Sequence, residues 1–220
     1  MGKKNISQEK IIQSFISCAF EKSAGATSLA DIADSLEIKK ASLYNHFENR
    51  EAMYNASIEY CGHEIKSVNF LPIQQLQVIK NNQITLFDLF KQLIERFFDL
   101  YENEPLFEMY SFIHAEKYFN VDALNIVREE NKIITDDIKA SLTAFITVEQ
   151  IGKKTEEELE NISNLLSSII IQQRDNYVAT KKEVVRQNPD SGAGSLFALP
   201  VNEKDLNKTI KIVENYLKLL

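Results

Sequence analysis

The sequence predicts an all-α protein, with a small N-terminal unit of short helices followed by a larger helical domain. Apolar residues recur at helical spacing in almost every segment, and no strand-like alternation is sustained. Side chains that can cap helices stand before many of these segments, and prolines and glycines fall between them. With 220 residues, 44% of them hydrophobic, the chain is long enough to bury two cores.

The first helix is predicted over residues 7–22, where Ser7 can serve as its N-cap. Gly25 is expected to take the left-handed conformation that often follows a helix end. The inner face of this helix is marked by apolar side chains at helical spacing, namely Ile12, Phe15, Ile16, Ala19 and Phe20.

Two short helices are predicted next. Ser28 and Asp31 have the spacing of a capping box, although Asp replaces the usual Glu. A third helix begins near Lys39 or Lys40 after an interruption in the pattern. The apolar face of the second helix follows the spacing i, i+3, i+4, i+7, and consists of Leu29, Ile32, Ala33 and Leu36.

The rest of the chain is predicted to be helical with two breaks. Residues 69–84 contain Pro72 and form a connector with room for one short helix. Residues 187–202 form a loop that holds two of the four prolines. Further helices are predicted over residues 49–68, 85–101, 105–119, 121–147, 155–187 and 203–220.

The net charge of −7 argues at first against a nucleic-acid partner, because phosphate binding needs local positive charge. The charge is unevenly distributed, however. Residues 1–50 hold seven basic and six acidic side chains, whereas the remainder of the chain carries a net charge of −8. The acidity therefore belongs to the larger domain, and the N-terminal unit stays available to DNA.

A cytoplasmic location is expected. The most apolar run, residues 165–171, is short and contains two serines, so no transmembrane helix is expected. The segment after the N-terminus is too polar for a signal peptide. Cys18 and Cys61 fit a reducing compartment, and Cys18 is interpreted as a small buried hydrophobe.

Two short helices joined by a tight turn, behind a first helix, form a helix-turn-helix unit. Residues 27–54 read TSLADIADSLEIKKASLYNHFENREAMY, which resembles the N-terminal DNA-binding domain of the TetR family of bacterial regulators. The resemblance covers about a fifth of the chain. Glu37 departs from it, since the family has Gly in this turn; a left-handed non-glycine residue costs ~1 kcal/mol. The matching residues are Ile32, Ala33, Leu36, Ile38, Leu43–Phe47, Arg50 and Glu51.

The resemblance implies a set of DNA-binding residues, and the chemistry of each agrees. Lysines at the start of the recognition helix can reach phosphates and the major groove. Short polar side chains suit base edges, and hydroxyl, imidazole and guanidinium groups suit the DNA backbone. Taken alone, the two lysines would be a solvated pair and His46 a structural histidine. The predicted set is Thr27, Lys39, Lys40, Ser42, Tyr44, Asn45, His46 and Arg50.

The resemblance also implies a homodimer, because two recognition helices about 34–36 Å apart read a palindromic site. The last helix has a heptad seam, which packs against another helix. The alternative is that this seam packs only inside its own subunit. The predicted dimer interface consists of Ile162, Leu166, Ile169, Ile170, Tyr177, Leu206, Ile210, Val213 and Leu217.

A small-molecule effector is also implied for the second domain. Residues 97–119 are dense in aromatics, and helical bundles bind ligands in mostly apolar cavities with a few polar anchors. The effector would be partly hydrophobic. The alternative is that these side chains simply fill the core. The candidate residues are Phe98, Tyr101, Met109, Tyr110, His114 and Asn131.

The sequence therefore predicts a ligand-responsive transcriptional regulator, most often a repressor in this family. Residues 1–50 would bind DNA, a helix over residues 49–68 would link the domains, and residues 69–220 would bind the effector and dimerise. No enzyme, metal or cofactor is predicted, because no phosphate loop occurs and no histidine has a ligand partner at suitable spacing. Two alternatives are a helix-turn-helix protein controlled by a protein partner and a structural helical dimer without DNA function.

Overall fold

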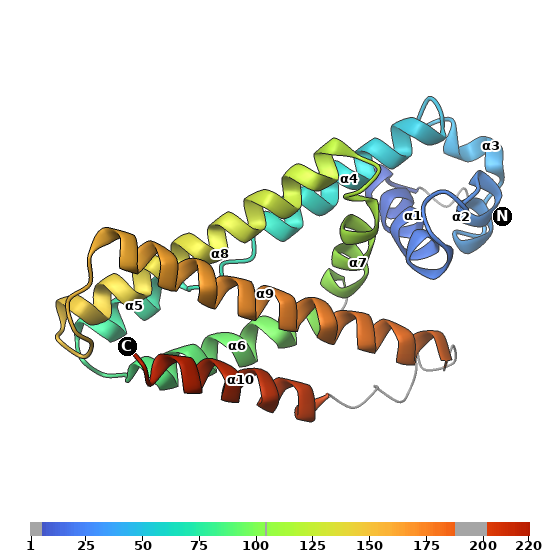
Figure 1. Ribbon diagram of the computed structural model, residues 1–220. Coiled ribbons are helices and arrows are strands. Elements are labelled where there is room, and N and C mark those ends of the chain that lie inside the picture. Colours follow the sequence, from blue (N-terminus) through green and yellow to red (C-terminus); the bar gives the residue numbers. More distant parts are fainter. Residues whose placement is uncertain (1–5, 104, 188–201) are drawn as a thin grey trace. The chain divides into compact units, whose positions relative to one another are not determined.

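The computed structural model describes residues 6–103, 105–187 and 202–220, and over these residues the chain is entirely helical (Figure 1). The predicted all-α fold is confirmed. The interior of the predicted loop at 187–202 lies outside the described residues. The helices are α1 (Gln8–Lys22), α2 (Leu29–Ser35), α3 (Lys40–Leu43), α4 (Arg50–Lys66), α5 (Ile73–Lys80), α6 (Leu86–Glu102), α7 (Leu106–Glu116), α8 (Val121–Thr147), α9 (Glu156–Gln187) and α10 (Glu203–Leu217).

Local capping explains why these helices begin where they do. The side chains of Ser7, Asn49 and Thr85 each accept a hydrogen bond from a backbone N–H in the first turn that follows. At α2, the Ser28 hydroxyl accepts from the Asp31 N–H at 3.2 Å, while the Asp31 carboxylate accepts from the Ser28 N–H at 2.7 Å. This is a complete capping box, so Asp is long enough to close it.

The end of α1 differs from the prediction. Ser23, and not Gly25, takes the positive φ, at 81°. The Ser23 N–H donates to the Ala19 carbonyl at 2.8 Å, so the helix stops as soon as Lys22 completes its last turn. The prediction of a left-handed Gly25 is therefore wrong by two residues, because glycine is common in this conformation at helix ends but is not required for it.

The described helices pack into two compact units. The first unit comprises residues 1–67 and 105–128, and the second comprises residues 68–104 and 129–220. The sequence-based division assigned everything after residue 68 to one domain. The structure instead packs α7 and the first turns of α8 with the N-terminal helices.

The core of the first unit explains this division. Phe15 of α1, Tyr54 of α4 and Phe112 of α7 form a cluster of edge-on rings with centroids 6.1–6.2 Å apart. Two hydroxyl–carboxylate hydrogen bonds tie α7 to the N-terminal helices: Ser17 donates to Glu108 at 2.5 Å, and Tyr54 donates to Glu116 at 2.8 Å. The α7 helix is therefore an integral part of the first unit.

The second unit is a bundle in which α6, α9 and α10 pack together, with α9 and α10 side by side (Figure 1). The α6 helix is amphipathic: nine of its 17 residues are buried, whereas Lys91, Gln92 and Asp99 are exposed on its other face. Phe97 packs edge-on against Phe70 and Tyr101, with centroids 5.2 and 5.0 Å apart. The interior of this unit is thus rich in aromatic rings.

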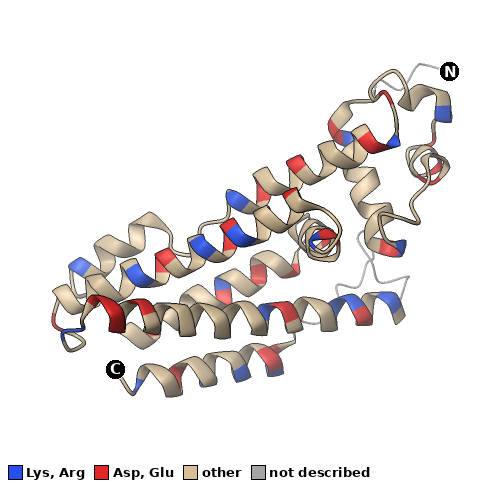
Figure 2. Cartoon of the chain, turned by 45° about the horizontal axis from the view of Figure 1, so that its top comes forward, with Lys and Arg blue, Asp and Glu red and all other residues tan. Residues whose placement is uncertain are grey.

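Charge is distributed unevenly along α9. Figure 2 shows acidic residues at its start, an uncharged middle and mixed charges towards its end. The uncharged stretch is residues 161–173. In the described part of the chain, no helix has both the length and the apolar character needed to span a bilayer.

Candidate nucleic-acid interface

The turn between α2 and α3 depends on one strained residue. Glu37 has φ of 55°, the left-handed conformation predicted for this position. Its N–H donates to the Asp34 carbonyl at 3.0 Å, and the Ile38 N–H donates to the Ala33 carbonyl at 2.9 Å. These bonds terminate α2 and redirect the chain into α3, so the turn forms without glycine.

The inner side of α3 is fixed by burial. Leu43 is fully buried and Phe47 is 9% exposed, and both pack in a core with Ile32 and Ala33 of α2. The side chain of Gln8 donates from Nε2 to the His46 carbonyl at 2.9 Å, which ties α1 to the end of the α3 segment. The recognition helix, although short, is held firmly against its neighbours.

The outer side of the same segment carries six of the eight predicted DNA-binding residues. Tyr44 is 51% exposed, a high value for a large aromatic side chain. Lys39, Lys40 and Asn45 are also exposed, whereas Ser42 and His46 are half-buried. The segment therefore presents two cations, an amide and a phenol from one rigid element, the groups that contact phosphates and base edges.

Thr27 does not fit the predicted phosphate contact. Its side chain is 2% exposed, and its hydroxyl donates to the Ser23 carbonyl at 2.9 Å. The prediction for Thr27 is therefore wrong: the hydroxyl closes the end of α1 and is not presented to DNA.

Arg50 also has a structural position. Its Nε donates to the Thr27 carbonyl at 2.8 Å, and its Nη2 donates to the Ala24 carbonyl. The guanidinium also lies 5.6 Å from the centre of the Phe15 ring, within range of a cation–π contact. Arg50 thus fastens the α1–α2 turn to the start of α4, and its contact with phosphate stays a prediction.

Ion pairing at the edge of this unit is local. Lys22 Nζ lies 2.6 Å from Asp31 Oδ1. The hydrogen bond from Lys22, helped by the Ser28 N–H, lowers the pKa of Asp31 to about 2. Asp34 and Glu37 add exposed carboxylates to the helix-turn-helix segment, so its net positive charge is small.

The predicted dimer seam lies inside the second unit. Of the nine predicted residues, Ile162, Ile169 and Leu206 are half-buried. The α10 helix packs against α6 and α9 of its own chain, which supply the partner that the heptad pattern requires. The prediction is therefore wrong for the six residues that this packing buries: Leu166, Ile170, Tyr177, Ile210, Val213 and Leu217.

The predicted effector residues do not form one group within either unit. In the first unit, Met109 belongs to the hydrophobic core, and the rings of Tyr110 and His114 stack with centroids 3.8 Å apart. In the second unit, Phe98 packs edge-on against the ring of Tyr177 at 5.1 Å. The remaining two are Tyr101, which is buried, and Asn131, which lines an open groove between α8 and α9.

A buried polar network in the second unit was missed. Arg174 is 0% exposed; its Nη1 and Nη2 donate to the Glu130 carboxylate at 2.7 and 3.2 Å. Its guanidinium lies over the rings of Phe97 and Tyr101 at 4.8 and 4.7 Å. A signal existed in the sequence, because Arg174 continues the buried spacing of Leu166 and Ile170, and a charge on an apolar face needs a buried partner.

The geometry defines the class of protein. A capped helix is redirected by a tight turn into a second helix, whose inner side is buried and whose outer side is basic and polar. This is a DNA-binding helix-turn-helix unit.

Comparison with known proteins shows which family this unit resembles. Residues 12–57 match the model of the bacterial regulatory proteins of the tetR family, so the helix-turn-helix unit of this chain is similar to the DNA-binding domain of that family. It is similar to the biofilm operon icaADBC HTH-type negative transcriptional regulator IcaR of Staphylococcus epidermidis, with 46% identity over 54 residues, 24% of this chain and 29% of that protein. With IcaR of Staphylococcus aureus strain Newman, identity is 29% over 156 residues, 70% of this chain and 77% of that protein.

Solved structures share the fold of almost the whole chain. A TetR transcriptional regulator from Legionella pneumophila is 20% identical, with a TM-score of 0.53 over 96% of this chain and 98% of that one. The regulator FadR from Bacillus subtilis, solved in complex with stearoyl-CoA, has a TM-score of 0.53 at 14% identity, over 94% of this chain and 97% of that one. The fold of the larger helical region is therefore also that of TetR-family regulators.

Proposed function

We propose that this protein is a sequence-specific transcriptional regulator in the cytoplasm, which binds a palindromic operator as a homodimer and represses transcription. The observation that carries the proposal is the outer side of α3, where Lys39, Lys40, Tyr44 and Asn45 are exposed on a helix that is fixed from behind. Repression is supported by the similar IcaR proteins, which are negative regulators.

Each exposed residue has a proposed task. Lys39 and Lys40 neutralise phosphates, while Asn45 and the half-buried Ser42 contact base edges in the major groove. Tyr44 and His46 contact the DNA backbone. Because the helix-turn-helix segment has a small net charge, a single copy binds DNA weakly, and two copies acting together provide the affinity.

The proposal is tested by gel shift and footprinting with the DNA upstream of the gene that encodes the protein. Lys40→Ala is expected to weaken binding and to lower the slope of log affinity against log salt by about one unit. Lys208→Ala, an exposed lysine on α10, is the matched control and should change neither quantity. The proposal is refuted if no sequence-preferring, salt-dependent binding occurs.

We place the homodimer interface on a half-exposed apolar face of α9 and α10. On α9 this face consists of Ile162, Leu165 and Ile169, and Leu165 is 45% exposed. These residues lie in the uncharged stretch 161–173, and depletion of charge is typical of interface cores. On α10 this face consists of Ile212 and Tyr216, and Leu219, two residues after the end of α10, is 78% exposed.

The two sets of residues lie at the same end of the helix pair. The Lys154 Nζ, just before α9, donates to the Leu220 carbonyl at 2.9 Å, so the start of α9 lies beside the end of α10. Leu165→Glu is expected to convert the dimer to a monomer in sedimentation velocity. Val121→Glu, at another exposed apolar residue, is the control and should leave the dimer intact. A Leu165→Glu protein that remains dimeric would place the interface elsewhere.

We propose that a small, partly hydrophobic effector binds within the second unit, beside Phe98 and Tyr101. Aromatic walls there adjoin buried polar groups, the usual composition of an effector site. FadR, which shares this fold, was solved in complex with stearoyl-CoA, and this supports the proposal of a partly hydrophobic effector.

The chain connections between the two units provide a route by which an effector would release the protein from DNA. The chain passes between the two units at residues 67–68, 104–105 and 128–129, and the last crossing lies inside the continuous α8 helix. An effector that favours one arrangement of α6 and α8 therefore shifts the population of DNA-binding conformations. A thermal-shift screen with acyl and aromatic compounds tests this step, since a ligand of the folded state raises the unfolding temperature. A screen without stabilising compounds would favour control by a protein partner.

A further inference from the structure

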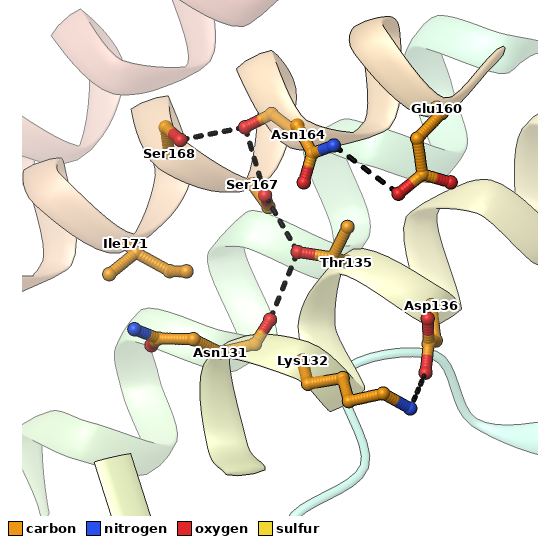
Figure 3. A pocket seen from close by; sticks show the side chains of 9 residues that line it. All are labelled: Asn131, Lys132, Thr135, Asp136, Glu160, Asn164, Ser167, Ser168 and Ile171. Carbon is orange, nitrogen blue, oxygen red and sulfur yellow. Dashed lines mark hydrogen bonds and ion pairs between the residues drawn. The ribbon is translucent and has the colours of Figure 1, made fainter. Parts of the chain in front are cut away.

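The second unit has an open polar groove between α8 and α9, outside its aromatic interior. Its volume is about 400 Å³, within the range of small-molecule sites. Figure 3 shows side chains from both helices facing this space. The lining is polar except for Ile171, and consists of Asn131, Lys132, Thr135, Asp136, Glu160, Asn164, Ser167, Ser168 and Ile171.

The hydroxyl groups that line the groove already donate hydrogen bonds to other atoms of the protein. The Thr135 hydroxyl lies 3.0 Å from the Asn131 carbonyl oxygen and 2.9 Å from Ser167 Oγ, so its single proton is engaged by one of these two acceptors. Ser167 and Ser168 both donate to the Asn164 carbonyl, at 3.0 and 2.7 Å. Each hydroxyl has a single proton, so these oxygens offer lone pairs to a ligand and accept hydrogen bonds from it.

One buried acceptor in the lining of the groove lacks a hydrogen-bond donor among the described residues. The Oδ1 of Asn131 is buried and has no hydrogen-bond partner among the described residues. An amide oxygen in this state is costly, because burial removes its water without supplying a donor. A ligand that brings an N–H group to this oxygen would recover that loss.

The charged groups add to the excess of acceptors. Lys132 Nζ is held by Asp136 Oδ2 at 2.9 Å, and the side-chain amide of Asn164 donates to Glu160 at 3.3 Å. Lys139, beside the groove, bridges Glu156 and Glu160 at 2.6 and 2.7 Å. Two lysines thus face three carboxylates, which leaves one net negative charge.

We infer that this groove is a binding site for a protonated amine that carries several N–H donors, such as a linear polyamine. An ammonium group complements the single negative charge, and its N–H groups complement the hydroxyl and amide oxygens. The mostly polar lining disfavours an acyl chain or an aromatic body, so the site differs in chemistry from the effector site proposed beside Phe98 and Tyr101.

Isothermal titration calorimetry of the purified full-length protein with spermidine tests the inference, at about 150 mM salt to screen diffuse attraction. One spermidine per chain is expected. Ser168→Leu fills the groove from an exposed position and should weaken binding about tenfold or more, and Asp136→Asn should weaken it several-fold. Thr180→Leu is the matched control, because Thr180 is also exposed on α9 and donates to the carbonyl four residues before it.

The control should bind spermidine as the unmodified protein does. The inference is overturned if spermidine does not bind, if Ser168→Leu binds it with unchanged affinity, or if neutral triethylene glycol binds as tightly. The experiment uses no DNA, so its result is independent of whether the protein recognises an operator.

Discussion

Arg50 provides the sharpest test of the structure, because the family resemblance and the structure assign it different tasks. In the structure its guanidinium donates to the carbonyls of Thr27 and Ala24 and lies over the ring of Phe15. A hydrogen bond that involves a charged group contributes about 1.5–3 kcal/mol, and an exposed cation–π contact about 0.5–1 kcal/mol. Since Arg50 is only half-buried, the lower ends of these ranges apply.

We expect Arg50→Met to lower the free energy of unfolding of the first unit by about 2–4 kcal/mol. Arg50→Lys keeps the charge but cannot span two carbonyls with one compact ammonium, so it should lose about half of that stabilisation. Urea denaturation gives the overall change, and hydrogen exchange of the amides in residues 23–29 shows whether the loss is local. Lys40→Ala, which removes an exposed cation from the same unit, should leave the stability unchanged within about 0.5 kcal/mol.

The two interpretations are separated by the salt dependence of DNA binding. If Arg50 is structural, Arg50→Met destabilises the first unit and leaves the salt slope of DNA binding unchanged. The structural reasoning is refuted if Arg50→Met keeps the stability of the unmodified protein and lowers the slope by about one unit, as loss of a phosphate contact would.

Three further predictions concern stability. Glu37→Gly should raise the free energy of unfolding by about 0.5 kcal/mol, since relief of the left-handed strain exceeds the added freedom of the unfolded chain; Glu37→Gln removes the charge alone and should not stabilise. Glu130→Leu leaves the guanidinium of Arg174 without that carboxylate and should cost about 3–5 kcal/mol in urea denaturation, most of which a second change, Arg174→Leu, should restore. Lys22→Met should lower the urea midpoint above pH 4, and the difference from the unmodified protein should vanish towards pH 2. In the folded protein the pKa of Asp31 is lowered from 3.8 to about 2, so the ion pair stabilises the fold above pH 3.8. This stabilisation is lost as the pH falls and Asp31 is protonated. An equal difference at both pH values would contradict the last prediction.

Helix boundaries were predictable because capping is local. Ser7, Asn49 and Thr85 each accept a hydrogen bond from the backbone N–H three residues later, so the sequence contains the whole interaction. The left-handed Glu37 was also predictable, because the helix-turn-helix pattern fixes the geometry of its turn. Ser23 was not, since several backbone geometries can end a helix and glycine marks only one of them.

The apolar periodicity of α10 does not predict which helices it packs against. The heptad seam of α10 correctly indicated a helix that packs on other helices, but a repeat of apolar residues does not specify whether the partner lies in the same chain. Here α6 and α9 of the same chain cover Ile210, Val213 and Leu217. Leu165 and Tyr216 are left accessible by this packing, so these residues, and not the seam, are the interface candidates.

The sequence also does not show that the aromatic-rich residues 97–119 are divided between two compact units. Density of aromatic residues along the chain does not reveal that the chain passes from one compact unit to the other at residues 104–105. Ser17 and Tyr54 donate to the carboxylates of Glu108 and Glu116, so α7 is held against the DNA-binding helices. Burial raises the pKa of the Tyr54 hydroxyl, which therefore remains a donor to Glu116 across the physiological range. It follows that α7 belongs to the DNA-binding unit. The effector proposed for the second unit would act on DNA binding through the chain crossings at residues 67–68, 104–105 and 128–129.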